Sequence, residues 1–432
     1  MSERLNIGVG LMGLGVIGTG VARALIGKAD EIARQVGCPV ILKKAVDCDV
    51  SKKKSSKIPS DIFTTDPNEI LHNPEIDIVI EVIGGDTHAL EYMKEALSRG
   101  KHVVTANKEA ISKHGQELLS IAATHKVGIR HEASVGGGIP IISPFKQDLL
   151  ANRITAIRAI INGTTNYIVT RMAAEDADFA TVLKQAQKLG YAEANPANDI
   201  EGVDAVYKLS ILATIAFRTV IHPEDIYREG ISRLSSRDFR YAKELGYTIK
   251  LLAIAKEENE SVEVRVHPAL IPDDQLLANV DGVFNAIEIE GDLTGKVIFY
   301  GRGAGPQPTS SAIVSDVIQL SQNIRLGLPP RPQPQPSQNK NITPTSQIVT
   351  RYYVRLTIDD NPGVLAQIAK VLGDNMISIA SAIQKEADEN SQTAEIVLMT
   401  HTAHESALQQ AMREIEALPA VREIGNLIRV ED

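Results

Sequence analysis

The chain has 432 residues, with 45 lysines and arginines against 54 aspartates and glutamates, for a formal net charge of −9. This length allows two or three domains, and the interspersed charges argue against a nucleic-acid-binding surface. Cys38 and Cys48 are too few for a disulfide framework, and no Cys/His cluster has zinc-ligand spacing. The sequence shows no signal-peptide pattern and no apolar run of membrane-spanning length. We therefore expect a cytoplasmic protein that does not contact a membrane.

The first predicted motif is a strand, a glycine-rich turn and a helix. Residues 5–12 predict a buried strand, and the helical residues 19–26 follow the turn. In this context the first glycine allows the tight turn, the second lets a pyrophosphate approach the backbone, and the third lets helix and strand pack closely. The N–H groups at the helix N-terminus also favour phosphate. The predicted dinucleotide-binding residues are Gly13, Leu14, Gly15, Val16, Ile17 and Gly18.

The second predicted strand, residues 40–46, ends at Asp47. An acidic residue at this position accepts hydrogen bonds from the ribose hydroxyls of NAD and repels the 2′-phosphate of NADP. The run Lys52-Lys-Lys54 follows, and it either binds that phosphate or forms a solvated loop. The sequence therefore favours NAD, or use of both NAD and NADP, and leaves the choice open.

Strand and helix patterns continue to alternate, which predicts a Rossmann-type sheet. The predicted segments are a strand at 77–84, a helix at 87–99, and strands at 102–106 and 127–132. Ligands of open α/β sheets bind at the carboxyl ends of strands, so Lys108 is expected near the nicotinamide rather than on the surface. The three glycines at 136–138 either allow close approach to a ligand or form a flexible connector.

The most informative stretch is residues 190–208, a polar loop that leads into an apolar helix. Asp204 and Lys208 are four residues apart and share a helical face. Because residues 209–217 are apolar, the helix should be buried, and its charged pair then needs a partner such as a substrate. A solvated ion pair is the alternative. The string Ala186-x3-Gly-Tyr-Ala-x2-Asn-Pro-x2-Asp-Ile-x-Gly-x-Asp-x3-Lys208 resembles the signature of homoserine dehydrogenases.

This resemblance implies reversible hydride transfer between a nicotinamide and C4 of homoserine, which gives aspartate semialdehyde. The alcohol proton must move as well, so a general acid/base is needed. Lys208 is expected in that role, with Lys108 polarising the oxygen and Asp204 orienting Lys208 or the substrate. The sequence leaves open which lysine transfers the proton. The resemblance places these further residues at the substrate or cofactor: Glu193, Asp199, Thr105 and Gly305.

The resemblance also implies a sodium ion. Its expected ligands are the Glu132 side chain and the main-chain carbonyls of Val135, Gly137 and Ile139, an oxygen set that suits a hard cation.

Residues 141–326 are expected to form an α+β catalytic and dimerisation domain. It contains the string Asn162-Gly-Thr-Thr-Asn-Tyr, also typical of the family, in which Thr164 or Thr165 is expected to cap a helix. The helix at 309–320 is expected to return to the nucleotide domain.

The proline-rich segment 327–347 lacks apolar periodicity and predicts a linker. Residues 348–432 follow the pattern βαββαβ of a ferredoxin-like fold and resemble an ACT domain, an amino-acid-sensing module. The family suggests threonine as effector, near Asn361 and Gly363, and a purely dimerising role is the alternative. We expect a homodimer or homotetramer.

The expected chain is thus α/β, with a Rossmann-type nucleotide domain at 1–140 ahead of the catalytic domain, the linker and the ACT domain. The closest enzymatic alternative, aspartate-semialdehyde dehydrogenase, needs a catalytic cysteine beyond the nucleotide fold, whereas both cysteines lie in the first βαβ unit. A non-catalytic amino-acid or redox sensor on a dehydrogenase scaffold is the alternative from another class. The presence of Lys108, Glu193, Asp204 and Lys208 argues against it.

Overall fold

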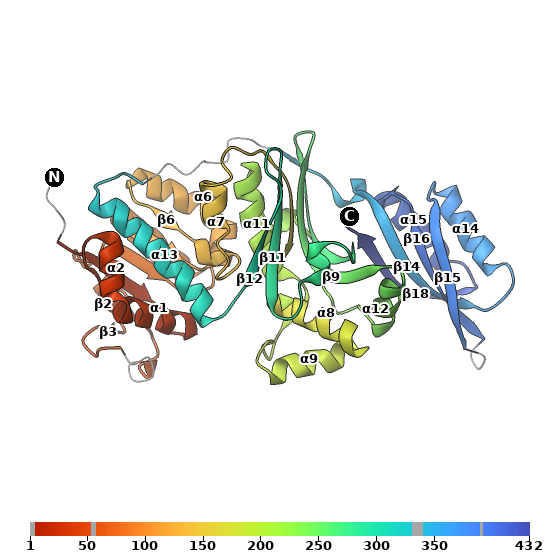
Figure 1. Cartoon of the computed structure of the whole chain (residues 1–432), viewed down its shortest axis with the longest axis horizontal. Coiled ribbons are helices and arrows are strands. Elements are labelled where there is room, and N and C mark those ends of the chain that lie inside the picture. The colour runs from red at the N-terminus through yellow and green to blue at the C-terminus, as the bar shows by residue number, and fades with distance from the viewer. Residues whose placement is uncertain (1–4, 53–57, 331–339, 389–391) are drawn as a thin grey trace. The chain divides into compact units, whose positions relative to one another are not determined.

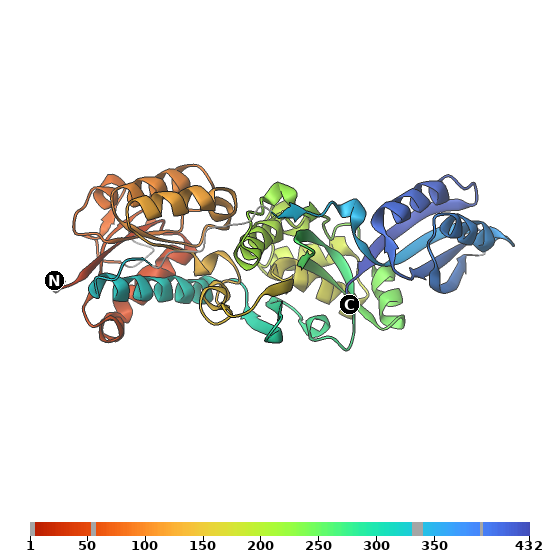
Figure 2. The same ribbon diagram turned by 90° about the horizontal axis from the view of Figure 1, so that it is seen from above.

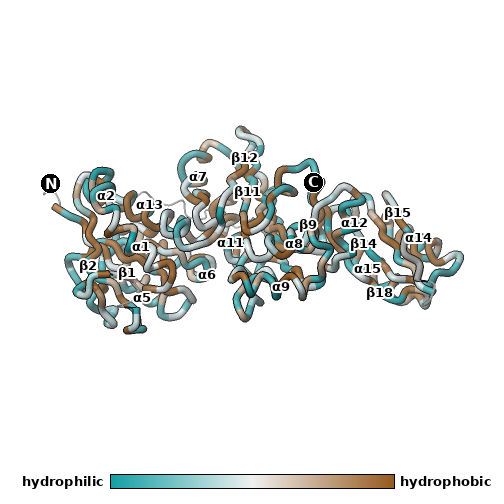
Figure 3. The backbone as a smooth tube through the Cα atoms, turned by 60° about the horizontal axis from the view of Figure 1, so that its bottom comes forward, coloured by the Kyte–Doolittle hydropathy of each residue, from teal (hydrophilic) through white to brown (hydrophobic). Residues whose placement is uncertain are grey.

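The computed structural model describes residues 5–52, 58–330, 340–388 and 392–432 (Figure 1). The chain divides into two compact units. The first comprises residues 1–154, 207–223 and 291–339, and the second comprises residues 155–206, 224–290 and 340–432. In both units hydrophobic and hydrophilic residues alternate along the chain (Figure 3).

The first unit contains a parallel sheet with the strand order β3-β2-β1-β4-β5-β6, which confirms the predicted Rossmann-type fold. All six residues of β1 are buried, as expected for a parallel strand covered on both faces. The strands are β1 (Ile7–Met12), β2 (Val40–Val46), β3 (Phe63–Thr64), β4 (Ile78–Glu81), β5 (His102–Thr105) and β6 (Ile129–Arg130).

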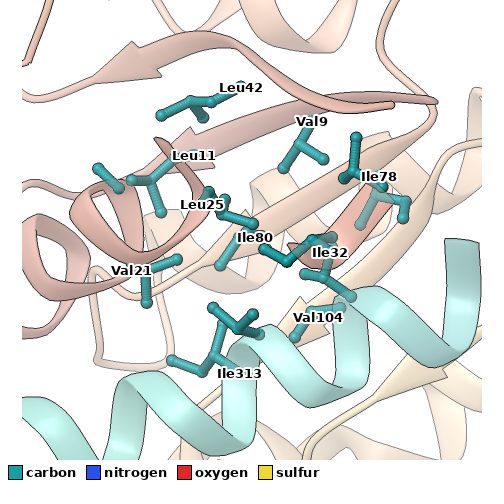
Figure 4. Close-up of a cluster of buried hydrophobic side chains, with 14 of the residues drawn as sticks. Val9, Leu11, Val21, Leu25, Ile32, Leu42, Ile78, Ile80, Val104 and Ile313 are labelled. Atoms are coloured by element: carbon teal, nitrogen blue, oxygen red, sulfur yellow. The ribbon is translucent and has the colours of Figure 1, made fainter. Parts of the chain in front are cut away.

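Helices cover this sheet, and one of them comes from far along the chain. The helices of the first unit are α1 (Val16–Gly27), α2 (Ala29–Val36), α4 (Asn68–Leu71), α5 (His88–Ser98), α6 (Lys108–Thr124), α7 (Ile142–Lys146) and α13 (Pro306–Arg325), with the 3-10 turn η1 (Glu132–Ser134). The core cluster joins Val9 of β1, Ile80 of β4 and Val21 of α1 to Ile313 of α13 (Figure 4). The helix expected at 309–320 is therefore α13, and it completes the nucleotide-domain core. The strand β12 (Gly295–Arg302) precedes it.

The second unit contains a mixed sheet with the order β11-β7-β9-β10-β18-β14-β16-β15. Its long strands are β7 (Ile154–Ile160), β9 (Tyr247–Glu258), β10 (Ser261–Pro272), β11 (Phe284–Gly291), β14 (Val349–Asp359), β15 (Ile379–Asp388), β16 (Thr393–Thr400) and β18 (Val421–Val430). Its short strands are β8 (Tyr227–Arg228), β13 (Asn341–Ile342) and β17 (Ala403–His404). Its helices are α8 (Gly163–Glu175), α9 (Phe179–Lys188), α10 (Ala197–Ile200), α12 (Ser236–Glu244), α14 (Val364–Asp374) and α15 (Glu405–Glu416), with 3-10 turns η2 (Pro223–Asp225), η3 (Leu276–Asn279) and η4 (Thr345–Gln347). Helix α11 (Val203–Phe217) begins in this unit and continues into the first.

The C-terminal residues form the predicted βαββαβ module, β14-α14-β15-β16-α15-β18, with α14 and α15 side by side (Figure 2). This module shares its sheet with the rest of the second unit, because β18 pairs in parallel with β10 at Ala269↔Arg429 and Leu270↔Val430. Part of the predicted linker, residues 331–339, lies outside the described residues. Its last residues include β13, which also pairs with β10.

Buried ion pairs join the C-terminal module to the other strands and helices of the second unit. The Glu431 carboxylate accepts hydrogen bonds from Arg158 Nε at 2.7 Å and Arg265 Nη2 at 2.8 Å, and it lies 2.6 Å from Lys256 Nζ. The Arg355 guanidinium donates to Asp238 Oδ1 of α12 at 2.7 Å. Such charges are expensive to bury unless they are paired, so these contacts hold the module in one register on the shared sheet.

Candidate active site

The glycine-rich turn between β1 and α1 has a separate physical need for each glycine. Gly13 has φ of 98°, a left-handed conformation that side chains disfavour. A Cβ on Gly18 would lie 1.9 Å from the Gly13 carbonyl oxygen, so only glycine fits there. A Cβ on Gly15 would meet no atom within 4 Å, which leaves the backbone at this point open to a ligand. A cavity of about 1020 Å³ adjoins this turn.

Asp47, at the end of β2, holds the glycine-rich turn in place. Its Oδ2 accepts a hydrogen bond from the Leu14 N–H at 2.7 Å, and its Oδ1 accepts one from the Asp49 N–H at 2.9 Å. Three basic side chains line the cavity beside the turn, namely Arg23, Lys28 and Lys52. Of the predicted lysine run, Lys53 and Lys54 lie outside the described residues. Sequence reasoning missed Arg23 and Lys28, although their position on the helix after the glycines was a usable signal.

A buried network fixes the carboxyl ends of β4 and β5. The Thr105 hydroxyl donates to Glu81 Oε2 at 2.6 Å, and the other Glu81 oxygen accepts the N–H groups of Ile83 and Gly84. Asn107 caps α6 by accepting the Ala110 N–H at 3.0 Å. Lys108 therefore stands at the first position of α6, directly after a turn that has little freedom. Sequence reasoning missed Glu81, although a charged residue at the end of an apolar strand was a usable signal.

The two candidate catalytic lysines belong to adjacent helices of the first unit. Lys108 precedes Glu109 on α6, and Lys208 follows Tyr207 on α11. The Tyr207 hydroxyl donates to Glu109 Oε1 at 3.4 Å, and Lys113 lies over the Tyr207 ring while its Nζ pairs with Glu109. Both lysine side chains are half-buried. The contact between their sequence neighbours therefore brings the start of α6 close to this part of α11.

In the second unit, two polar residues of the signature, Asp199 and Asp204, meet through Asn162. Its Nδ2 donates to Asp199 Oδ1 at 2.7 Å and to Asp204 Oδ2 at 2.8 Å. The Asn162 Oδ1 accepts the Thr165 N–H at 2.9 Å, so Asn162 caps α8. The expectation that Thr164 or Thr165 would cap this helix was wrong, because the helix begins at Gly163 and both threonines lie inside its first turn.

Asp204 and Lys208 occupy successive turns of α11, as predicted, and the Asp204 side chain is buried. Glu193 lies upstream on an exposed loop, whose main chain is held by a hydrogen bond from Gln187 Nε2 to the Glu193 carbonyl oxygen at 3.1 Å. The Glu193 carboxylate thus faces solvent on a loop that α9 anchors. Asn162 itself was not among the predicted site residues, although it lies in a recognised string.

The loop after β6 contains the residues for which the sequence predicts a sodium ion. The buried Glu132 carboxylate accepts the N–H groups of Ile141, Ile142 and Ser143 at 2.7–2.8 Å and so caps α7. Gly137 has φ of 56°, and a Cβ there would lie 2.3 Å from the Gly303 carbonyl oxygen.

Within the described ranges, no main-chain N–H donates to the carbonyls at positions 135, 137 and 139. The described residues contain no cluster of three or more His, Cys, Asp or Glu side chains that would hold a metal. A cation here would thus be held by carbonyls and one carboxylate.

Asp316 of α13 is tied to the same loop, since its Oδ2 accepts the Glu132 N–H at 2.9 Å. Burial raises the pKa of Asp316 to about 7, with the nearby Glu132 carboxylate acting in the same direction. The folded-state pKa therefore lies above the ordinary value of 3.8. The Asp316 contribution to stability is thus most favourable below about pH 4 and is lost as the pH rises through about 7.

We expect Asp316→Asn to raise the free energy of unfolding at pH 8 by up to about 4 kcal/mol relative to the unsubstituted chain, and to change it little at pH 4. The asparagine oxygen still accepts the Glu132 N–H, so the hydrogen bond is kept. Urea unfolding at both pH values measures the difference. An equal effect at pH 4 and pH 8 would show that the charge on Asp316 is not the cause.

The predicted effector residues lie in the turn between β14 and α14. Gly363 has φ of 90° and is the residue before α14, and Asn361 is exposed in the same turn. The neighbouring Asp360 accepts a hydrogen bond from Gln384 of β15 at 3.3 Å, so the turn is joined to that strand.

A parallel sheet with an open glycine-rich turn, together with two lysines on adjacent helices, defines a dinucleotide-dependent oxidoreductase. Three family models match the chain: the homoserine dehydrogenase NAD-binding domain at residues 13–132, homoserine dehydrogenase at 140–318 and the ACT domain at 352–420. The chain belongs to the homoserine dehydrogenase family and has homoserine dehydrogenase activity, as its sequence predicted. The alternative of a non-catalytic sensor is therefore wrong.

Full-length relatives support this assignment. The homoserine dehydrogenase of Neisseria gonorrhoeae is 43% identical, with 98% of each chain covered. That of Bacillus subtilis is 39% identical, again with 98% of each covered. A crystal structure of a homoserine dehydrogenase from Thiobacillus denitrificans has a TM-score of 0.93 at 43% identity and covers 99% of this chain and 98% of that one. A hyperthermophilic archaeal homoserine dehydrogenase in complex with NADPH is 28% identical, with a TM-score of 0.63, and covers 75% of this chain and 99% of that one.

None of the helices in the described ranges combines the length and the hydropathy that a membrane span needs.

Proposed function

We propose that Lys208 is the general acid/base of the reaction and that Lys108 polarises the substrate oxygen. When bound, the nicotinamide accepts the hydride from C4 of homoserine. The hydroxyl proton must leave as that C–H bond breaks, and a neutral lysine amine placed at the oxygen accepts it. The observation that carries this proposal is the Tyr207–Glu109 contact at 3.4 Å, which brings the start of α6 close to the Lys208 turn of α11.

Asp204 and Asp199 are proposed to orient the substrate and the start of α11. Support comes from their shared donor Asn162, whose amide holds both carboxylates together at the start of α11. Glu193 is proposed to bind the substrate ammonium, because it is an exposed carboxylate on the signature loop. Thr105 and Gly305 are proposed to line the cofactor, since Thr105 ends β5 and Gly305 is the residue before α13.

NAD is proposed as the preferred cofactor, with NADP also accepted. Asp47 supports NAD because its carboxylate stands at the end of β2, next to the glycine-rich turn that it holds. Arg23, Lys28 and Lys52 support a capacity for NADP, because they line the cavity beside that turn and a 2′-phosphate attracts cations. The NADPH complex of the archaeal relative fits the same view of the family.

We expect initial rates of homoserine oxidation to give a higher kcat/KM with NAD than with NADP. Asp47→Ser should lower this ratio at least about tenfold, because the repulsion of the 2′-phosphate is removed while a hydroxyl can still accept the Leu14 N–H. Arg23→Gln is the matched variant and should lower kcat/KM for NADP more than for NAD. If neither variant changes the ratio of kcat/KM for NAD to that for NADP, the roles assigned to Asp47 and Arg23 are both wrong. If the unsubstituted chain shows no turnover with either cofactor, the proposed site is wrong.

A sodium ion is proposed at the Glu132 loop, and threonine is proposed as the effector at the turn of Asn361 and Gly363. The uncapped carbonyls and the buried carboxylate support the first, since hard cations prefer oxygen ligands. The ACT match over residues 352–420 supports the second. The same rate assay, repeated with sodium replaced by tetramethylammonium and with added threonine, tests both. A homodimer or homotetramer is proposed for the assembly, to be checked by light scattering.

A further inference from the structure

Asp199 and Asp204 lie on either side of a tight turn in the second unit. Asp199 belongs to α10, Asp204 lies in the first turn of α11, and Glu201 and Gly202 connect the two helices. The Gly202 N–H donates to the Asp199 carbonyl oxygen at 2.9 Å and closes this turn. The positions of both carboxylates therefore depend on the contacts that hold Glu201 and Gly202.

Residues 227–232, which comprise β8 and the loop after it and are called the β8 segment below, pack against this turn. The Ile231 N–H donates to the Ile200 carbonyl oxygen at 2.9 Å. Arg228 Nη1 donates to the Glu201 carbonyl oxygen at 2.7 Å. Hydrogen bonds to two successive carbonyls thus join the β8 segment to the main chain of the turn.

The contact between the β8 segment and the turn leaves no spare room. A Cβ on Gly230 would lie 2.5 Å from the Ile200 carbonyl oxygen and 2.8 Å from Glu201 Cα, closer than Cβ atoms approach such atoms in folded proteins. Ser232 Oγ also donates to Glu201 Oε1 at 3.1 Å. Because two segments packed this closely cannot shift independently, a displacement of the β8 segment also displaces the turn and its two aspartates.

The C-terminal module holds the β8 segment through Arg429 of β18. Arg429 donates from Nη1 to Glu229 Oε1 at 2.9 Å and from Nη2 to the Tyr227 hydroxyl at 3.3 Å, and its guanidinium lies 5.0 Å from the centre of the Tyr227 ring. The Tyr227 hydroxyl also donates to Glu229. Burial raises the pKa of Tyr227 to about 12, so this hydroxyl keeps its proton at neutral pH. Arg429 therefore binds two side chains of the β8 segment, one through charge and the other through its hydroxyl and ring.

The position of Arg429 is itself fixed by partners inside the C-terminal module. Its side chain is 1% exposed, and its Nε and Nη2 donate to the two oxygens of Glu405 at 2.8 and 2.7 Å. Glu405 begins α15 and also accepts the Tyr352 hydroxyl of β14 at 3.0 Å. Two parallel hydrogen bonds to one carboxylate fix the orientation of a guanidinium as well as its place. The Glu229 carboxylate therefore faces a cation whose position is set by α15 and β14.

We propose that Arg429 and Glu229 are positioning residues for homoserine: their ion pair holds the β8 segment, and through it the turn of Asp199 and Asp204, in the geometry that binds the substrate. The C-terminal module is then a structural part of the substrate site. In this chain, homoserine binding depends on the module even when no effector is bound. This inference rests on the proposed substrate role of the two aspartates.

The first test compares the steady-state kinetics of Glu229→Ala with those of the unsubstituted chain in its native assembly. Arg429 keeps both hydrogen bonds to Glu405 in this variant, so the C-terminal module should stay folded. We expect the KM for homoserine to rise at least about tenfold and the KM for NAD to change less than about twofold, because a small misplacement of binding groups costs up to about 100-fold. A merely structural loss would reduce the amount of active enzyme and leave both KM values unchanged.

Three further variants separate the explanations. Glu229→Gln keeps an oxygen that accepts from Arg429, so its KM for homoserine should stay within about threefold of the unsubstituted value. Arg429→Lys lacks the fork that holds Glu405 while reaching Glu229, so it should raise this KM as Glu229→Ala does, and the double variant should add less than about twofold. Glu224→Ala, at an exposed position of η2, is the matched control and should leave both KM values within about twofold.

Hydrogen exchange followed by mass spectrometry gives a readout that does not depend on turnover. In Glu229→Ala the amides of the β8 segment, among them the Ile231 N–H, should exchange at least about tenfold faster than in the unsubstituted chain, because the segment opens more often. The same segment in Glu224→Ala should exchange as it does in the unsubstituted chain.

Unchanged exchange or an unchanged KM for homoserine in Glu229→Ala would overturn the proposal, as would effects of Glu229→Ala and Arg429→Lys that multiply in the double variant. Asp204→Asn distinguishes this failure from failure of the proposed function. If Asp204→Asn raises the KM for homoserine and Glu229→Ala does not, the link through the β8 segment is wrong. If neither raises it although exchange is faster in Glu229→Ala, the substrate role of Asp204 is wrong, and the positioning role falls with it.

Discussion

Replacing Lys208 with alanine should lower kcat for homoserine oxidation by at least about 10³-fold, while the Kd for the dinucleotide changes less than about twofold. A general acid/base commonly contributes 10²- to 10⁴-fold, and the substituted chain has no other amine on this turn of α11. Steady-state kinetics with NAD, together with a direct titration of NAD binding, measures both quantities. Turnover like that of the unsubstituted chain would remove Lys208 from the mechanism.

Two further variants sharpen this test. Lys208→Arg keeps the positive charge but cannot release its proton near neutral pH, so it should be as inactive as Lys208→Ala if proton transfer is the role. Lys188→Ala, at an exposed position in the last turn of α9, is the control and should stay within about twofold of the unsubstituted chain. If Lys108→Ala loses the pH dependence of kcat and Lys208→Ala keeps it, Lys108 is the general acid/base and Lys208 is the residue that polarises the oxygen.

The substitution Glu431→Gln should lower the stability of the second unit by about 3–5 kcal/mol. The side chain is 2% exposed and is shared by Arg158, Lys256 and Arg265, so its loss leaves buried positive charge without its anion. Native-state hydrogen exchange at the amides of β10 and β18 reports the local free energy of opening. A loss below about 1 kcal/mol would show that the cluster contributes little to the shared sheet.

The loss of stability in Glu431→Gln, relative to the unsubstituted chain, should also depend on pH. Burial raises the pKa of Glu431, but the cations Lys256, Arg265 and Arg158 together lower it further, so the net pKa lies below the ordinary range. The stabilisation is present above the unfolded-state pKa and is lost as the pH falls through the folded-state value. The difference in the free energy of opening between Glu431→Gln and the unsubstituted chain should therefore become smaller as the pH falls. Asp374→Asn, which breaks the exposed pair of Lys370 and Asp374, is the control, with an expected loss below about 0.5 kcal/mol.

The sequence alone was enough for the parts of this protein that short-range patterns encode. Apolar strands, the turn from Gly13 to Gly18 and the order βαββαβ follow from hydrophobic period and from glycine conformation, which are properties of neighbouring residues. The signature from Ala186 to Lys208 identified the family for the same reason, since its spacings are local. The start of α8 was nevertheless misplaced, because Asn162 rather than Thr164 or Thr165 is its N-cap.

Only the tertiary structure decided which distant residues meet. Asn162 joins Asp199 and Asp204 from 37 and 42 residues away, and Tyr207 reaches Glu109 from 98 residues away. Ile313 enters a core whose last strand, β5, ends at Thr105, 208 residues earlier. Glu431 pairs with cations from three strands, β7, β9 and β10. None of these pairings has a sequence period, because they result from how whole helices and strands pack and from the need of each buried charge for a partner.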